Sequence, residues 1–288
     1  MSDTAIPIGK PTRQDDGAAA ARAPLRAQAN RRRLAALAWH LAPWLLPALL
    51  FALWRIGCER GWIAPQILPP PAMVWQTLEE LARSGDLLAN TWISLQRVLL
   101  GFAAGSLAGF AIGAWLGISR TAEAYVLPSF NAVVQIPVLG WLPFLLLLVG
   151  VGEPLKIILI AHAALVPVAM STLQGFREAP VALDEAARVF GYSRLQRIVH
   201  VVLPAAVPTL ATGVRLAFTK AWLALVVVEL VASSEGLGYL IVYGRQLFQL
   251  DLVMADVVIV GAIGYAINRL LDALEARLRR GRASAFRG

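Results

Sequence analysis

Long uncharged apolar blocks alternate with short polar segments along this chain of 288 residues. Four blocks carry no formal charge over 20 to 29 consecutive positions: 34–54, 98–119, 124–152 and 157–176. A helix needs about 20 mostly apolar residues to cross the hydrocarbon core of a bilayer. Each of the four blocks is therefore predicted to span a membrane.

Two further apolar stretches, 209–232 and 252–274, are interrupted by charges. The interrupting residues are Arg215, Lys220, Glu229, Asp256, Arg269 and Asp272. Together the six stretches predict an all-α polytopic membrane protein with about six transmembrane helices. The block 124–152 also contains Pro128, Pro137 and Pro143. Because proline removes a helical hydrogen bond, that block is either one helix or a broken helix with a re-entrant piece.

The positive charges are distributed unevenly along the chain, whose net charge is +8. Seven of the 26 Lys and Arg residues precede the first block, five follow position 276, and five more lie at Arg120 and in 177–197. The loops of the opposite side hold four. Positive loops remain in the cytoplasm, so both termini and the central loop are predicted to be cytoplasmic. The basic composition thus indicates topology rather than a nucleic-acid partner.

Four regions follow from this pattern. Residues 1–33 are polar and predict a disordered cytoplasmic tail rather than a signal peptide, and 34–91 hold the first span and a periplasmic segment. In that segment, 73–92 predict a surface amphipathic helix that either packs on the bundle or binds a partner. Residues 92–276 form the core transmembrane domain and 277–288 a basic cytoplasmic tail. Cys58 is the only cysteine, so an internal disulfide is impossible.

Glycine recurs at every fourth position of the second span, in GFAAGSLAGFAIGAWLG. The repeated residues are Gly101, Gly105, Gly109, Gly113 and Gly117. On a helix of 3.6 residues per turn they form a slowly winding groove. Small residues allow close approach of helix backbones in a membrane. We expect this groove to serve helix packing, and a substrate-lining role is the alternative.

The central segment 178–208 carries local signals for two short helices. Pro180 suits the first turn of a helix, and Gly191 suits the left-handed position that ends it. Ser193 and Gln196 form a capping-box start for a second helix, which Pro204 and Pro208 are expected to stop. From these signals alone, the segment is either a rigid loop or a docking element for a soluble partner.

The spacing in this segment resembles the loop signature of bacterial ABC importer permeases. The motif reads E-A-A, three residues, G, nine residues, an apolar residue, one residue, and L-P. Its matches here are Glu185, Ala186, Ala187, Gly191, Val201, Leu203 and Pro204, with Asp184 beside them. The family more often has Ile at the position of Val201. Segments within 62–280, such as SLQRVLLGFAAG and QIPVLGWLPFLLLLVGVGEPLKI, resemble the branch that transports aliphatic sulfonates, taurine and nitrate.

The resemblance implies a type I ABC importer permease in the bacterial inner membrane. The loop would then be a coupling helix that docks on separate ATPase subunits, which bind the ATP and Mg²⁺. A periplasmic binding protein would deliver a small anion, with aliphatic sulfonate expected before taurine or nitrate. The permease would be a homodimer in the lipid bilayer. The chain itself would hold no cofactor or metal and would not be an enzyme.

The candidate pathway residues come from two places. Arg215, Trp222 and Glu229 recur every seven residues, so they share one face of the fifth predicted helix. We expect this face to line the pathway, since ionisable groups in a membrane usually face protein or water. The alternatives are that the two charges reach the membrane boundaries, or that Arg215 pairs with a distant carboxylate. Lys220 on another face is a further candidate.

The second place is the uncharged segment 135–141, because prolines leave backbone groups free to face a cavity. Its candidates are Gln135, Pro137 and Trp141. Simple kinking of the helix is the alternative.

Three rival functions remain at this stage. A secondary transporter or channel would work without an ATPase, but it leaves the central loop unexplained. A membrane-bound enzyme is disfavoured because the sequence has no GxxxxGK[ST], HExxH or GxSxG motif and no Cys/His cluster. An ABC importer permease for a non-anionic substrate, such as a pyrimidine-type precursor, is the third.

Overall fold

The computed structural model describes residues 42 and 44–285, with side chains as far as Arg277. The chain divides into two compact units, 1–64 and 65–288. In the first unit, residues 44–59 are helical, and Arg55 donates to Glu59 at 2.7 Å. The predicted tail 1–33 and the start of the first predicted span lie outside the described residues.

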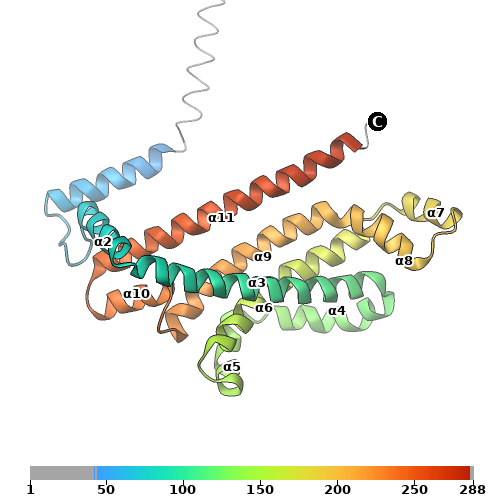
Figure 1. Cartoon of the computed structure of the whole chain (residues 1–288), viewed down its shortest axis with the longest axis horizontal. Coiled ribbons are helices and arrows are strands. Elements are labelled where there is room, and N and C mark those ends of the chain that lie inside the picture. Colours follow the sequence, from blue (N-terminus) through green and yellow to red (C-terminus); the bar gives the residue numbers. More distant parts are fainter. Residues whose placement is uncertain (1–41, 43, 286–288) are drawn as a thin grey trace, which may run out of the picture. The chain divides into compact units, whose positions relative to one another are not determined.

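The second unit is built from helices alone over the part that the structure describes, as predicted (Figure 1). Its elements are α2 (Pro71–Ser84), α3 (Asp86–Ile118), α4 (Arg120–Val134), η1 (Val138–Trp141), α5 (Leu142–Val149), α6 (Glu153–Arg177), α7 (Val181–Val189), α8 (Arg194–Arg197), η2 (Ile198–Val202), α9 (Leu203–Ala232), α10 (Leu237–Gln246) and α11 (Leu250–Ala285).

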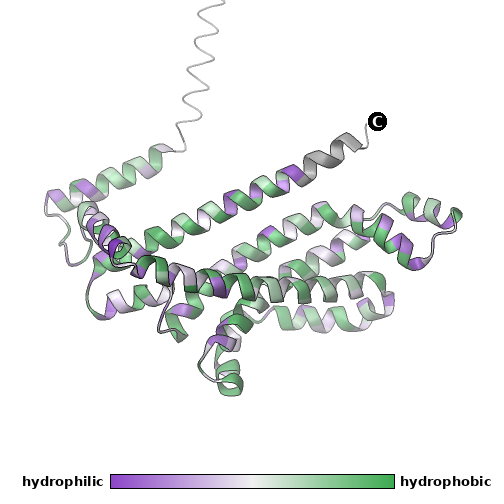
Figure 2. Ribbon diagram, in the orientation of Figure 1, coloured by the Kyte–Doolittle hydropathy of each residue, from purple (hydrophilic) through white to green (hydrophobic). Residues whose placement is uncertain are grey.

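Three described helices are long and apolar enough to cross a membrane alone: α3, α6 and residues 250–277 of α11. Two bent pairs raise the number to five. One pair is α4 with 138–149, bent by 89°, and the other is 194–232 with α10, bent by 41°. The sequence left open whether the block 124–152 is one helix or two pieces, and the structure has two pieces with the break between Val134 and Val138. Most of the ribbon of these helices is green in Figure 2, so their residues are mainly hydrophobic.

Helices α3 and α6 lie side by side along most of their length (Figure 1). The five repeated glycines of α3 are where the two backbones meet. A methyl group added at Gly105 would lie 2.1 Å from the carbonyl oxygen of Ala161, and one at Gly109 would lie 2.4 Å from that of Leu165. Only a residue without a Cβ allows this approach.

The largest apolar cluster forms where α3, α6, α9 and α11 meet. Val98, Ile160, Leu225 and Ile259 are buried there, from one helix each. Burial of such a cluster does not drive folding within lipid as it does in water, so shape complementarity fixes the arrangement.

Two helix boundaries differ from the prediction. The amphipathic segment 73–92 is not one helix, because Gly85 at φ +86° separates α2 from α3. The expected stop near Pro204 and Pro208 is wrong: α8, η2 and α9 continue as one helical stretch. The π-helical turn η2 ends at Val202, two residues before Pro204, and the wider turn carries the helix past a residue that has no N–H to donate.

Candidate functional site

The α7–α8 segment lies at the end of the second unit opposite α2 and α10 (Figure 1). Gly191 has φ +77°, and the chain turns there from one short helix to the next. The amide of Gly191 donates to Arg188 at 2.9 Å and that of Tyr192 to Ala187 at 3.0 Å, which together form a Schellman motif. The predicted capping box of Ser193 and Gln196 is present.

Asp184 ties the two short helices together. Its carboxylate accepts from Arg188 at 2.7 Å, one turn along α7, and from Arg197 at 2.8 Å, at the end of α8. Burial alone would raise the pKa of the Asp184 carboxyl, but the two guanidinium groups more than offset this and hold that pKa below its ordinary value. A third cation, Arg194, donates to the carbonyl of Ile118 at 3.0 Å and attaches the segment to the end of α3. The segment is therefore braced internally and against the bundle.

Large apolar side chains project from this braced segment. Val189 is 87% exposed and Phe190 is 81% exposed, next to exposed Val181 and Leu195. We call these four residues the apolar knob. Of the motif residues, Glu185 and Ala186 are exposed beside the knob, Ala187 is buried, and Val201, Leu203 and Pro204 are half-buried at its base. Exposed apolar groups held on a rigid support are typical of a protein docking surface.

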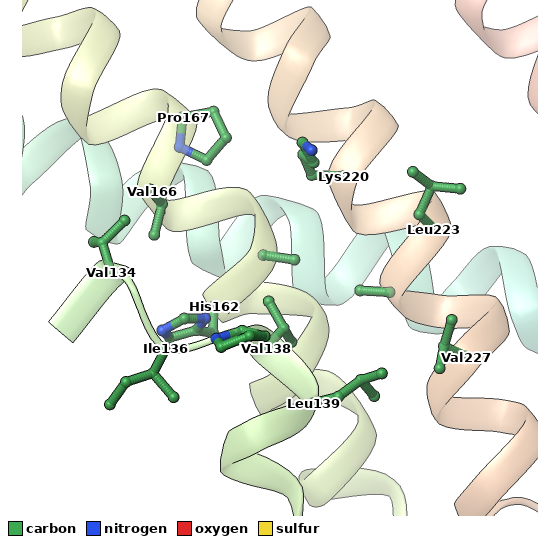
Figure 3. Close-up of a pocket in the computed structure, with 13 residues that line it drawn as sticks. Val134, Ile136, Val138, Leu139, His162, Val166, Pro167, Lys220, Leu223 and Val227 are labelled. Atoms are coloured by element: carbon green, nitrogen blue, oxygen red, sulfur yellow. The ribbon is translucent and has the colours of Figure 1, made fainter.

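A cavity of about 410 Å³ lies between the α4–η1 junction, α6 and α9 (Figure 3). Ile136, Pro137, Val138 and Leu139 line it on one side, and Lys220 lines it from α9. Two of the predicted pathway residues, Pro137 and Lys220, thus face one space. Gln135 and Trp141 are not among its lining residues, and Trp141 packs instead beside a cluster that includes Leu155.

The predicted stripe Arg215, Trp222 and Glu229 does not line this cavity, and its members have other partners inside the chain. Trp222 is 8% exposed and contacts α11 at Gly264, where an added methyl would lie 2.7 Å from the indole nitrogen. Arg215 pairs with Asp272 and with Glu275. The alternative that Arg215 meets a distant carboxylate is therefore confirmed. Arg215 and Trp222 are directed toward α11, whereas Glu229 meets α3 and the start of α10.

Glu229 belongs to a buried polar network that the sequence analysis missed. The carboxylate is 1% exposed and accepts from Arg97 at 2.8 Å, from Ser94 at 2.8 Å and from the Gly238 amide at 3.0 Å. Arg97 also donates to Glu153 at 2.6 Å and to the carbonyl of Glu235 at 2.7 Å. These bonds hold the turn between α9 and α10. The only sign of this network in the sequence was Arg97, which directly precedes the second apolar block.

The family described as the binding-protein-dependent transport system inner membrane component matches residues 101–280. A Bacillus subtilis (strain 168) relative named as an aliphatic sulfonates transport permease is 38% identical over 83% of this chain and 87% of its own length. An Escherichia coli (strain K12) relative of the same name is 34% identical over 78% and 85%. The taurine transport system permease of E. coli is 33% identical over 80% and 86%.

A solved structure of the MetNI methionine ABC transporter, in inward-facing conformations, aligns with a TM-score of 0.56 at 21% identity. The match covers 66% of this chain and 94% of that chain, and it shows a shared fold. The relatives are named as transport permeases rather than as enzymes, and the family is described as an inner membrane component. The fold, the matched region and the close relatives agree: this chain belongs to the binding-protein-dependent inner membrane components, the permease subunits of ABC importers.

Proposed function

We propose that this permease imports aliphatic sulfonates and that a separate ATPase subunit drives it through the segment 178–208. The observation that carries the coupling role is the apolar knob on its ion-paired support. A few buried anchors, often aromatic, contribute most of the binding energy of protein interfaces, and Phe190 is the aromatic residue of the knob. The charge-assisted bonds of Asp184 make the segment rigid enough to transmit a displacement to the bundle.

A displacement of the segment 178–208 can be transmitted directly to the membrane helices α9 and α3. The segment continues through η2 into α9 without a break in the helical stretch, and Arg194 joins it to the end of α3. Closure of an ATPase dimer would move two docked segments together and tilt these helices. Alternating access to the two sides of the membrane would follow from that motion.

The assembly follows from the same proposal. Two copies of this chain would form the pathway in the lipid bilayer, with two ATPase subunits on the cytoplasmic side and a periplasmic binding protein on the other. The knob and both termini would face the cytoplasm. ATP and Mg²⁺ would bind to the ATPase subunits only.

The substrate assignment is supported by two relatives whose names specify aliphatic sulfonates and by one whose name specifies taurine. Taurine and nitrate are the next candidates. A pyrimidine-type precursor is the non-anionic alternative within the same family.

The test compares two exposed phenylalanines at opposite ends of the second unit. Phe190 belongs to the knob, whereas Phe248, 90% exposed, lies between α10 and α11. The full chain, its ATPase subunit and its binding protein are coexpressed, and ATPase copurification and ATP-driven sulfonate uptake into proteoliposomes are measured. Phe190→Ser is expected to reduce both, and Phe248→Ser is expected to leave copurification intact.

Equal copurification in the two variants would contradict the coupling role of the knob. Sulfonate uptake by the permease alone, driven by an ion gradient, would instead support a secondary transporter.

A further inference from the structure

The cavity between the α4–η1 junction, α6 and α9 combines an apolar wall with two nitrogen-bearing side chains. His162 and Lys220 are the exceptions among its 13 lining residues, and the others are Val, Ile, Leu, Ala or Pro. Figure 3 shows His162 of α6 beside Ile136 and Val138, whereas Lys220, Leu223 and Val227 lie along α9 on the other side of the view. Volumes of about 300 to 1,000 Å³ suit small organic ligands.

Lys220 lies near the middle of α9, where an ammonium group in contact with lipid is costly. No ion pair or hydrogen bond joins its side chain to the part of the chain that the structure describes. The other lysine of the bundle, Lys156, pairs with Glu153 at 2.8 Å. Lys220 is exposed, so water or an anion in the cavity can solvate its ammonium group.

His162 is the second group and the one that the sequence did not single out. Its Nδ1 is enclosed and has no hydrogen-bond partner among the described residues. The ring lies against the indole of Trp141, with 6.1 Å between centroids, which restricts its orientation. Since Nδ1 is enclosed, Nε2 is the ring nitrogen through which His162 could bind a ligand.

The cavity wall carries no acidic side chain among the described residues, and this limits the charge of a ligand. A ligand's ammonium group would find no carboxylate there and would be repelled by Lys220. A hydrocarbon body, in contrast, would be covered by Val138, Leu139, Leu223 and Val227, and burial of each CH₂ is favourable.

We propose that this cavity binds an organic monoanion with a short hydrocarbon body, such as an alkanesulfonate, during its passage through the permease. Lys220 and His162 bind the anionic head, and the aliphatic wall binds the body. The inference rests on the proposed sulfonate import and deepens it: the permease itself selects for an alkyl anion over a zwitterion of taurine type and over a small inorganic anion.

The first test uses the complete transporter in proteoliposomes at saturating binding protein, with propanesulfonate, taurine and nitrate as probes. Lys220→Met is expected to lower propanesulfonate uptake about 10- to 100-fold, the equivalent of one charge-assisted hydrogen bond. Lys220→Arg keeps the charge and is expected to restore most of the uptake. His162→Phe keeps the ring and is expected to lower uptake without loss of ATPase copurification. Arg83→Met removes an exposed cation outside the cavity and serves as the control.

The second test does not depend on the folding of charge variants. Cys58 is the only cysteine, so Val227→Cys in a Cys58→Ser background places one thiol on the cavity wall. Propanesulfonate is expected to slow the alkylation of this thiol in the assembled transporter severalfold. Nitrate at the same concentration is expected to leave the alkylation rate unchanged.

The outcomes separate the two proposals. If the wild type lacks ATP-driven sulfonate uptake, the proposed function fails. If that uptake is present but Lys220→Met transports propanesulfonate at the wild-type rate, or the thiol reacts equally fast with and without propanesulfonate, the cavity proposal alone is overturned.

Discussion

The contact between α3 and α6 predicts a specific response to a single added methyl group. In Gly105→Ala the new Cβ would lie 2.1 Å from the carbonyl oxygen of Ala161, whereas real Cβ atoms essentially never come within 3.0 Å of such an atom. The obstacle is backbone, so it cannot rotate away, and the two helices must separate by about 1 Å. Overpacking of this kind costs about 1–3 kcal/mol. The gain from replacing glycine in a helix, about 0.5–1 kcal/mol, offsets only part of it.

Two other glycines provide matched comparisons. Around Gly117 the nearest atom is the Cβ of Phe176, which is fixed by the backbone but lies 2.8 Å rather than 2.1 Å from the added methyl, so Gly117→Ala is expected to cost less. Around Gly261 in α11 no atom lies within 4 Å, so Gly261→Ala is expected to be neutral or stabilising by less than about 1 kcal/mol. The three variants should therefore rank Gly261→Ala, Gly117→Ala, Gly105→Ala in decreasing stability.

The assay is thermal unfolding of the purified permease in nanodiscs, followed by the fluorescence of its nine tryptophans. Size-exclusion chromatography before heating verifies that each variant is folded at the start. An unfolding midpoint for Gly105→Ala equal to that of Gly261→Ala would refute the close approach of the two backbones.

Three further predictions concern other parts of the structure. Gly191→Ala should destabilise the α7–α8 turn by about 1–2 kcal/mol, because the φ of +77° at this position disfavours a residue with a Cβ. The added methyl meets no other atom within 4 Å, so the backbone conformation is the only cause. Gly191→Asn should cost less, and ATPase copurification after mild heating measures the difference. Arg97→Met leaves the buried Glu229 carboxylate uncompensated and should cost about 3–5 kcal/mol. The double variant with Glu229→Met should cost less than the sum of the two single changes in the same unfolding assay. Because the native pKa of Asp184 is depressed, its stabilising effect is present above its ordinary pKa and is lost as the pH falls through the native value. ATPase copurification by the wild type should then fall at acid pH toward the level of Asp184→Asn. If the pH profiles of the wild type and of Asp184→Asn were parallel, the ion pairs of Asp184 with Arg188 and Arg197 would not stabilise the segment.

The signals that predicted structure correctly were local ones. The turn at Gly191 and the cap at Ser193 depend on residues within a few positions, and the structure has both. The stop expected at Pro204 failed for a related reason. Proline forbids a regular α-helical bond, but a π-helical turn that ends two residues before it allows the helix to continue.

Partners far apart in the sequence could not be predicted in this way. Arg97 and Glu229 are 132 positions apart, and no local pattern indicates that a membrane arginine will meet that glutamate rather than water. The seven-residue spacing of Arg215, Trp222 and Glu229 defines a common face of α9, but the neighbouring helices decide what that face meets. Lys220, on another face, was left without a partner in the described chain and faces the cavity.

The sequence by itself determined which segments enter the membrane, where the central segment turns and to which family the motif points. Those properties arise from transfer free energies and backbone preferences summed over neighbouring residues. Only the tertiary structure decided which polar groups neutralise one another and which face an open space, because both depend on the packing of α3, α6, α9 and α11. The same close packing that buries Glu229 against Arg97 leaves Lys220 and His162 at the wall of one cavity.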